Sequence, residues 1–261
     1  MKLTLLGTGG SAGLPQIGGP DGKGDWGKTD PGEPRNRRTR ASAALTLDDS
    51  RVILIDTAPE LRLQLTACGI RRVDAVLYTH AHADHVAGLD DIRILNRLLN
   101  APMPGFATAP VWEELQARFA YAFLPYDGKF FIRPVIVPHD LTPGGRTEIA
   151  GAEMLVFEQD HGFSTSLGLR VGRLAYCTDV VRLSEAALGA LAGLDLLVVD
   201  CFTTRDHPTH AGLPTVLGWV ERLAPKRTVL THLGPDMDYA TLKRTLPAGI
   251  EPGYDGMELP L

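Results

Sequence analysis

Three histidines and one aspartate fall within six residues of this 261-residue chain, in the string THAHADH over residues 79–85. Imidazole nitrogens and carboxylate oxygens are the donors that zinc and similar divalent ions take in proteins. In an extended chain His80 and His82 point the same way and can grip one ion, while Asp84 and His85 turn toward a second position. A solvated, His-rich loop is the ordinary alternative. The apolar strand predicted just before the motif favours a metal site.

Four residues do not fill two coordination shells, so the motif needs partners from elsewhere in the chain. Three ligand-type residues follow other predicted apolar strands: His161, Asp179 and His232. Each alone is typical of an ordinary loop, but their recurrence at strand ends is hard to explain by solubility. We therefore expect two divalent ions per chain, zinc or manganese, because imidazole and carboxylate accept both.

Short apolar runs alternate with helical patterns along the chain and must position these residues. Strands are predicted at Lys2–Leu6, Ala43–Leu47, Val52–Asp56, Ala75–Thr79, Val135–Val137, Met154–Asp160, Ser166–Val171, Leu174–Thr178, Leu196–Asp200 and Thr228–Thr231. Helices are predicted at Pro59–Cys68, Asp90–Asn100, Val111–Tyr121, Ser184–Leu191, Leu213–Leu223 and Tyr239–Thr245. Both halves carry sheet and helix, which favours an α/β fold built as a four-layer αββα sandwich over a doubly wound parallel sheet. Residues 7–40 predict a long irregular loop.

The composition is that of one globular domain over residues 1–261, with 44% hydrophobic and 22% charged residues. A net charge of −5 disfavours a general nucleic-acid coat. Three widely spaced cysteines predict no disulfide framework and suit a reducing compartment. No apolar run approaches the roughly 18 residues of a membrane helix, and the N-terminus lacks a signal-peptide pattern. We expect a cytoplasmic protein without a membrane partner.

The THAHADH string, with the later His161, Asp179 and His232, resembles the metallo-β-lactamase-fold hydrolase superfamily over essentially the whole chain. The resemblance implies a metallo-β-lactamase-like sandwich with two metal positions. One would be held by His80, His82 and His161. The other would be held by Asp84, His85 and His232, and Asp179 would bridge both.

Finer features are similar to the PhnP-type phosphodiesterases, which open cyclic ribosyl phosphates. They are the opening LTLLGTGGSAGLP, the RNRRTR run at residues 35–40, the strand end at 199–201, the Thr209–His210 pair, and YDGME near the C-terminus. PhnP-type proteins usually hold an extra zinc with cysteines in the early loop. Residues 18–34 contain neither Cys nor His, so we expect no cysteine-bound structural zinc here.

The charge of the expected site predicts a phosphate substrate. Two divalent ions outweigh Asp84, Asp179 and a bridging hydroxide by about one charge, which favours an anion and the charge that develops on phosphoryl oxygens. We expect a small phosphodiester, attacked at phosphorus by the metal-bridging hydroxide. His210, which the resemblance aligns with the PhnP-type catalytic histidine, would protonate the leaving alkoxide. Asp84 is the second predicted catalytic residue.

Alternatives remain open at this stage. An RNA 3′-end endonuclease would need a protruding basic arm, and no long insertion of that kind is present; nucleic acid is an unlikely partner. A thioester or lactone hydrolase of the same fold and a metal-binding protein without turnover are further alternatives. The PhnP-type resemblance implies a possible homodimer.

Three smaller hypotheses concern residues near the predicted site. The GTGGSA segment at residues 7–12 loosely matches a dinucleotide fingerprint but has no helix after it, so we expect a loop passing the metal site. The arginines of 35–40 are either a solvated edge or phosphate anchors. Asp255 is a candidate to support a metal-bound histidine.

Overall fold

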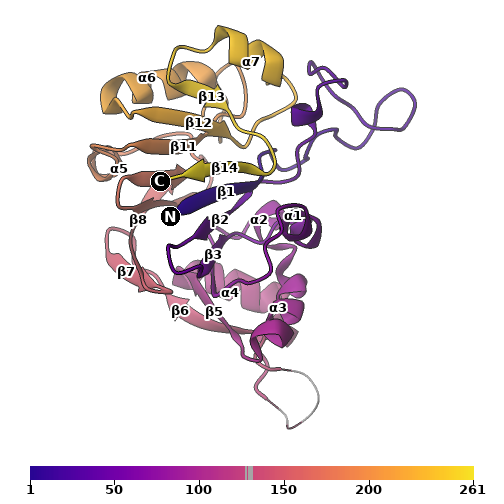
Figure 1. Ribbon diagram of the computed structural model, residues 1–261, viewed down its shortest axis with the longest axis vertical. Helices are drawn as coiled ribbons and strands as arrows, with labels where there is room; N and C mark the ends of the chain where they lie inside the picture. The colour runs from indigo at the N-terminus through magenta and orange to yellow at the C-terminus, as the bar shows by residue number, and fades with distance from the viewer. Residues whose placement is uncertain (127, 129–131) are drawn as a thin grey trace.

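The computed structural model describes residues 1–126, 128 and 132–261 and contains two seven-stranded sheets (Figure 1). The first sheet is built from β1 (Lys2–Gly7), β2 (Ser42–Thr46), β3 (Val52–Ile55), β4 (Ala75–Leu77), β5 (Met103–Ala107), β6 (Ile136–Asp140) and β14 (Met257–Pro260). The second is built from β7 (Arg146–Ile149), β8 (Ala152–Asp160), β9 (Thr165–Val171), β10 (Leu174–Cys177), β11 (Leu196–Asp200), β12 (Arg227–Thr231) and β13 (Ile250–Pro252).

The two sheets share one plan. Their orders are β14-β1-β2-β3-β4-β5-β6 and β13-β12-β11-β10-β9-β8-β7. In the first sheet the pairs from β14 to β3 are antiparallel and those from β3 to β6 are parallel. In the second, the pairs from β7 to β10 are antiparallel and those from β10 to β13 are parallel. Both sheets are therefore mixed, and the chain starts and finishes on the neighbouring strands β1 and β14.

Helices cover the outer face of each sheet. On the first sheet they are α1 (Leu61–Ala67), α2 (Ala83–Val86), α3 (Ile92–Leu99) and α4 (Ala109–Arg118), with 3-10 turns at Leu89–Asp91 and Ala120–Phe123. On the second they are α5 (Glu185–Ala190), α6 (Leu213–Leu223) and α7 (Tyr239–Thr245). Figure 1 shows α6 and α7 at one end of the molecule and α1 to α4 toward the other.

Three apolar cores fill the spaces between these layers. Alternate residues of one strand serve two of them: Ile53 and Ile55 of β3 face the core between the sheets, while Val52 and Leu54 pack under the helices of the first sheet. A third core lies between the second sheet and α5 to α7. Strands buried on both faces read as continuous apolar runs, which is why they were visible in the sequence. The predicted four-layer αββα sandwich is confirmed.

The structure adds elements that the sequence patterns do not predict. β5 reads MPGFA, and proline and glycine ordinarily argue against a central strand. Gly105 is required there because a Cβ would lie 2.5 Å from Ile136 Cγ2 and 2.8 Å from the Trp112 ring. The strands β7, β13 and β14 are short, with β7 and β13 at the two edges of their sheet, and α2 is a four-residue helix.

The long loop between β1 and β2 is irregular, as predicted, and extends away from the sheets in Figure 1. It contains one 3-10 turn at Pro34–Asn36. The buried guanidinium of Arg38 donates to the backbone carbonyls of Gly234 (3.3 Å) and Met237 (2.6 Å) and so ties the loop to the segment before α7. No helix among the described residues is long and apolar enough to cross a membrane.

Neither hypothesis for the arginines of 35–40 describes the whole run. Arg35 pairs with Glu33 and lies over the Tyr239 ring, with 4.2 Å from its Cζ to the ring centroid. Arg38 is 2% exposed, and Arg40 pairs with Glu60. These three side chains hold the loop in place through an ion pair or buried hydrogen bonds, and phosphate anchoring by this run stays a prediction.

Candidate metal centre

The ends of strands from both sheets meet at one place and bring the predicted ligands together. His80 and His82 follow β4, and Asp84 and His85 lie on α2. From the second sheet, His161 follows β8, Asp179 follows β10 and His232 follows β12. The backbone turns sharply at two of these strand ends, since Asp179 and His232 have φ angles of 53° and 55°. Non-glycine residues seldom adopt this left-handed conformation, and it tends to persist at functional sites.

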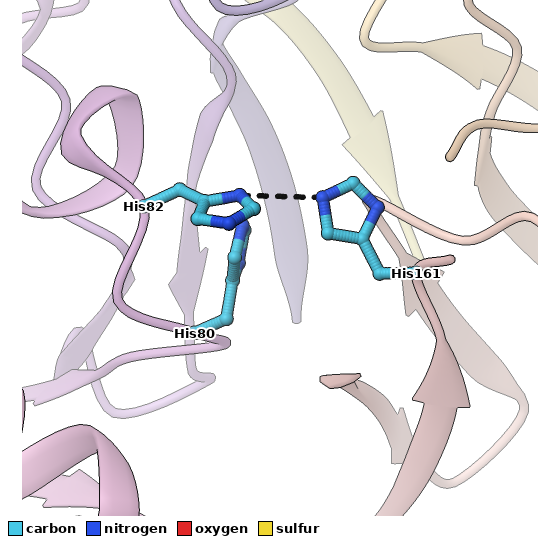
Figure 2. Close-up of side chains that lie close together, drawn as sticks. All are labelled: His80, His82 and His161. Atoms are coloured by element: carbon cyan, nitrogen blue, oxygen red, sulfur yellow. Dashed lines mark hydrogen bonds between the residues drawn. The ribbon is translucent and has the colours of Figure 1, made fainter. Parts of the chain in front are cut away.

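Three histidines form one side of the site. The donor atoms of His80, His82 and His161 all lie within 4.8 Å of one another. Figure 2 shows the three rings converging, with 3.3 Å between His82 Nδ1 and His161 Nε2. This is the first of the two ligand sets that the resemblance implies.

Neighbouring groups fix which nitrogen of two of these rings faces the site. Nδ1 of His161 lies 2.7 Å from the carbonyl oxygen of Thr209, which can only accept, so this nitrogen carries the proton. Nδ1 of His80 lies 3.0 Å from the hydroxyl of Thr79, which itself donates to Asp56. Nε2 of each ring is therefore left with a free lone pair toward the site, as metal binding requires.

Asp84, His85, Asp179 and His232 form the other side, again with donor atoms within 4.8 Å of one another. Asp179 occupies the centre. Its Oδ2 is 3.1 Å from His85 Nε2, and its Oδ1 is 3.4 Å from His232 Nε2. The same Oδ1 is 3.7 Å from His161 Nε2 and 3.8 Å from His80 Nε2, so it faces both ligand sets. This position between the two sets is the one expected of a bridging carboxylate.

Burial and carboxylates pull the pKa values of the imidazoles apart. Burial holds the pKa of His80 well below its ordinary value and also lowers that of His161. Burial opposes the charged form of His232 too, but the carboxylates of Asp179, Asp84 and Asp200 outweigh it and raise its pKa to about 9. The pKa of His85 is raised well above its ordinary value in the same way. Without an ion, protons on these two rings balance the buried carboxylates.

The residues fit a site for divalent metal. Nε2 of His80, His85 and His232 is buried in each case and, although it lies 3.1–3.8 Å from Asp179, makes no hydrogen bond of good geometry within the described part of the chain. Buried polar atoms are rarely unpaired in folded proteins, so three such nitrogens aimed at one carboxylate call for another partner. A divalent cation satisfies imidazole lone pairs and carboxylate oxygens together. The cluster therefore fits a metal site.

His210 lies beside this cluster, in the segment between β11 and α6. It belongs to a group with His161 and Asp179 whose donor atoms lie within 4.8 Å of one another. Its ring stacks on that of His232, with 4.6 Å between centroids, and Phe202 packs 5.0 Å away. The ring centroids of His207 and His210 are 5.4 Å apart, so His207 is a further imidazole beside His210.

Two supporting aspartates were not predicted from the sequence as site residues. Asp56 accepts from the backbone and hydroxyl of Thr79 and lies 2.7 Å from Nδ1 of His85. Asp200 is fully buried and lies 2.8 Å from Nδ1 of His210. The only sequence signal for either is a carboxylate closing an apolar strand. The hypothesis for Asp255 was wrong: this carboxylate accepts from the backbone and hydroxyl groups of Thr8 and Thr39 and pins the early loop.

The early loop passes the site, as predicted from the GTGGSA segment. Gly10 approaches so closely that a Cβ there would lie 2.7 Å from the Phe202 ring and 3.4 Å from His232 Cε1. The segment thus packs against a predicted ligand and an aromatic neighbour of His210. A side chain at this position would displace one of them.

Two adjoining hollows open beside the centre. The first, which we term the histidine cavity, has a volume of about 540 Å³ and is lined by His80, His82, α4 residues and residues 164–167. Arg118 of α4 pairs with Glu114 and donates to the carbonyl of Ala81, so it braces the segment between the two histidines. The second, the Phe163 hollow, has a volume of about 820 Å³ and shares Glu158, Ser164 and Thr165 with the first.

Comparison with known proteins agrees with this geometry. The family model of the beta-lactamase superfamily domain matches residues 51–233. The structure of a diphosphatase from the PhnP family has a TM-score of 0.88 and 34% identity, covering 99% of this chain and 96% of that one. Zinc-bound PqqB from Methylobacterium extorquens has a TM-score of 0.76 at 19% identity over the whole of both chains, which shows a shared fold. An octanoyltransferase from Porphyromonas gingivalis is 30% identical over 99% of this chain, which spans about half (51%) of that relative.

Proposed function

Because this chain belongs to the beta-lactamase superfamily, we propose that it is a metal-dependent hydrolase that cleaves phosphodiester bonds in small substrates. The observation that carries the proposal is the position of Asp179, which faces two sets of buried imidazoles. Seven side chains, namely His80, His82, Asp84, His85, His161, Asp179 and His232, are the proposed ligands. Two ions, zinc or manganese, are the proposed cofactors.

Bound divalent ions would supply Lewis acidity and lower the pKa of water, which is the chemistry that phosphate ester hydrolysis needs. The chain itself sets the charge of the site. Five of the seven proposed ligands are imidazoles, which are neutral as ligands, and only Asp84 and Asp179 are carboxylates. The loaded site is therefore positive, which favours an anionic substrate and the charge that develops on phosphoryl oxygens.

We propose that His210 protonates the leaving oxygen. Its Nδ1 lies 2.8 Å from an oxygen of Asp200, an acceptor-only carboxylate, so Nδ1 carries a proton. This arrangement leaves Nε2 as the atom available to substrate. A proton held at Nε2 would pass to the leaving alkoxide as the bond to phosphorus breaks. Asp84, whose carboxylate lies 3.3 Å from His85 Nε2, is proposed to hold an ion and orient the attacking water.

Similarity supports phosphate chemistry but leaves open which linkage is cleaved. The PhnP-family neighbour is named a diphosphatase, and diphosphates share the anionic, phosphorus-centred reaction with phosphodiesters. The name of the octanoyltransferase favours acyl chemistry, which includes the thioester alternative, as a second candidate, but this chain matches only about half of that protein. An RNA endonuclease is disfavoured by the net charge of −5. A homodimer stays a prediction, which light scattering on the purified protein tests.

A substrate panel on metal-loaded protein tests the proposal. It contains bis(p-nitrophenyl) phosphate, a cyclic nucleotide, a nucleoside diphosphate, an octanoyl thioester and a lactone, with kcat/KM measured for each. We expect the highest values for the phosphate substrates and loss of activity in the Asp179→Asn variant. A thioester or lactone turned over faster than every phosphate compound would overturn the phosphate assignment. Activity that Asp179→Asn retains would indicate a contaminating enzyme.

A further inference from the structure

Phe163 stands in an unusual position for a large apolar side chain. It is 91% exposed, yet it lies two residues after the proposed ligand His161. The other phenylalanine near the centre, Phe202, packs against His210 and His232. Exposing a phenyl ring to water is unfavourable, and an exposed aromatic in a segment beside a reactive centre is suited to contact with a ligand.

The segment that presents Phe163 is held firmly. The backbone of His161 and Ser164 is joined by a hydrogen bond of 3.0 Å, and Phe163 N donates to the His161 carbonyl at 3.1 Å. Gly162 N donates to the Asp160 carboxylate at 2.7 Å. Gly162 has a φ of +79°, and a Cβ there would lie 2.6 Å from the Pro208 carbonyl, so the turn packs directly against the segment that carries His210. The ring is therefore presented from a fixed turn.

The surroundings of Phe163 combine one apolar surface with polar edges. The Phe163 hollow is lined by Phe163 and Leu183 and by polar groups that include Ser164, Thr165, Arg182 and Ser184. Arg182 is itself held by an ion pair with Asp160. A flat heterocycle needs this combination, with a ring to stack on and hydrogen-bonding groups around its edge. A fatty acyl chain would need an apolar channel instead.

The Phe163 hollow adjoins the histidine cavity, which reaches two of the proposed ligands. It shares Glu158, Ser164 and Thr165 with the histidine cavity, which His80 and His82 line. A phosphate at the proposed ligands can thus be joined through a sugar to a ring in the Phe163 hollow. We propose that Phe163 is a specificity-determining residue that stacks on the base of a nucleoside-type phosphodiester. This proposal rests on the proposed function and names its substrate class.

A matched pair of substrates tests it. Adenosine 2′,3′-cyclic phosphate and glycerol 1,2-cyclic phosphate contain the same five-membered cyclic diester, but only the first has a base. We expect Phe163→Ala to raise KM for the adenosine compound about tenfold, within the range of base–aromatic stacking, and to leave kcat and the glycerol compound unchanged. Phe163→Trp should restore the lower KM, and Phe163→Leu should not. Ile17→Ala, at a fully exposed apolar residue of the early loop, is the control.

The same variants are compared in binding of adenosine 2′-monophosphate and glycerol 2-phosphate to metal-loaded protein by calorimetry. A tenfold weaker Kd for the adenosine ligand alone supports stacking, even where no diester is hydrolysed. Turnover of neither diester by the wild type would count against the proposed function and not against this binding site. Equal effects of Phe163→Ala on both members of a pair, or no effect on either, would overturn the role of Phe163.

Discussion

Asp200 lies 2.8 Å from Nδ1 of His210, through an oxygen that also accepts the backbone N–H of Val180 at 3.0 Å. The carboxylate is fully buried at the end of β11, so it cannot turn to water when His210 moves. It therefore holds one tautomer and one orientation of the imidazole. An aspartate–histidine pair beside the proposed phosphate site is the arrangement expected of a directed proton donor.

We expect Asp200→Asn to lower kcat for an alkyl phosphodiester by about 100-fold, the lower end of general acid catalysis, because the amide can present an N–H to Nδ1 and favour the wrong tautomer. The ion content should stay close to that of the wild type, since Asp200 is not a proposed ligand. Steady-state kinetics together with elemental analysis check both statements. Unchanged kcat would show that His210 needs no orientation by Asp200.

The acid role of His210 predicts a dependence on the leaving group. His210→Ala should lower kcat for a diester with an alkyl leaving group by about 100-fold or more. With p-nitrophenolate, which leaves without a proton, the loss should be much smaller. The ratio of the two losses is the readout, and His139→Ala, at an exposed histidine stacked on Phe106, is the matched control. Equal losses for both leaving groups would place His210 in binding rather than in proton transfer.

The central position of Asp179 predicts how the ions are lost. Asp179→Asn should reduce the bound ions from about two per chain to fewer than one, because one carboxylate faces both ligand sets. His161 belongs to only one ligand set, so His161→Ala should leave about one ion per chain. Asp206→Asn, at an exposed carboxylate, should leave the content unchanged. Elemental analysis after dialysis gives the ratio, and identical losses in the first two variants would contradict two separable positions.

In the metal-free protein, the stability of the fold should depend on the protonation of His232. The metal-loaded protein should lack this dependence. The raised pKa of His232, about 9 against an ordinary 6.5, means that its protonated ring stabilises the folded metal-free protein fully below pH 6.5. That contribution, about 3 kcal/mol, is lost as pH rises through 9. Chelated protein should therefore have a lower Tm at pH 9.5 than at pH 6.5. With ions bound, His232 holds no proton and this component should vanish.

Thermal unfolding of the chelated and loaded proteins between pH 6 and 9.5 measures this difference. The His232→Gln variant provides the control, since without this ring the chelated protein should lose the part of its pH dependence that His232 contributes and keep the part that comes from the raised pKa of His85. A chelated protein whose Tm does not fall across this range would show that the carboxylates do not hold a proton on His232.

That the proposed ligands come together could be predicted because of where they stand in the sequence. His80, His82 and His85 form a dense motif, and His161 and His232 follow apolar strands, so residue type and local pattern point to one chemistry. Asp56 and Asp200 close the predicted strands Val52–Asp56 and Leu196–Asp200, where a carboxylate is an ordinary strand terminus. Their partners lie 29 and 10 residues away in sequence, and only the packed sheets show the contacts.

The elements that the sequence did not predict depend on contacts with residues outside their own segments. β5 becomes a central strand because Gly105 makes room for Trp112 and Ile136, which no pattern within residues 103–107 reveals. β14 is a strand because it pairs with β1 at the opposite end of the sequence. The sandwich itself was predictable, since most of its strands are buried on both faces and appear as apolar runs.

The proposed ligands are divided between the halves of the sandwich: His80, His82, Asp84 and His85 come from the first, and His161, Asp179 and His232 from the second. Ion binding by these residues would therefore join the two halves of the sandwich. The free energy of ion binding would then stabilise the contact between the two halves. A protein depleted of its ions should therefore open locally along this contact, with faster amide exchange at the facing strand ends of both halves.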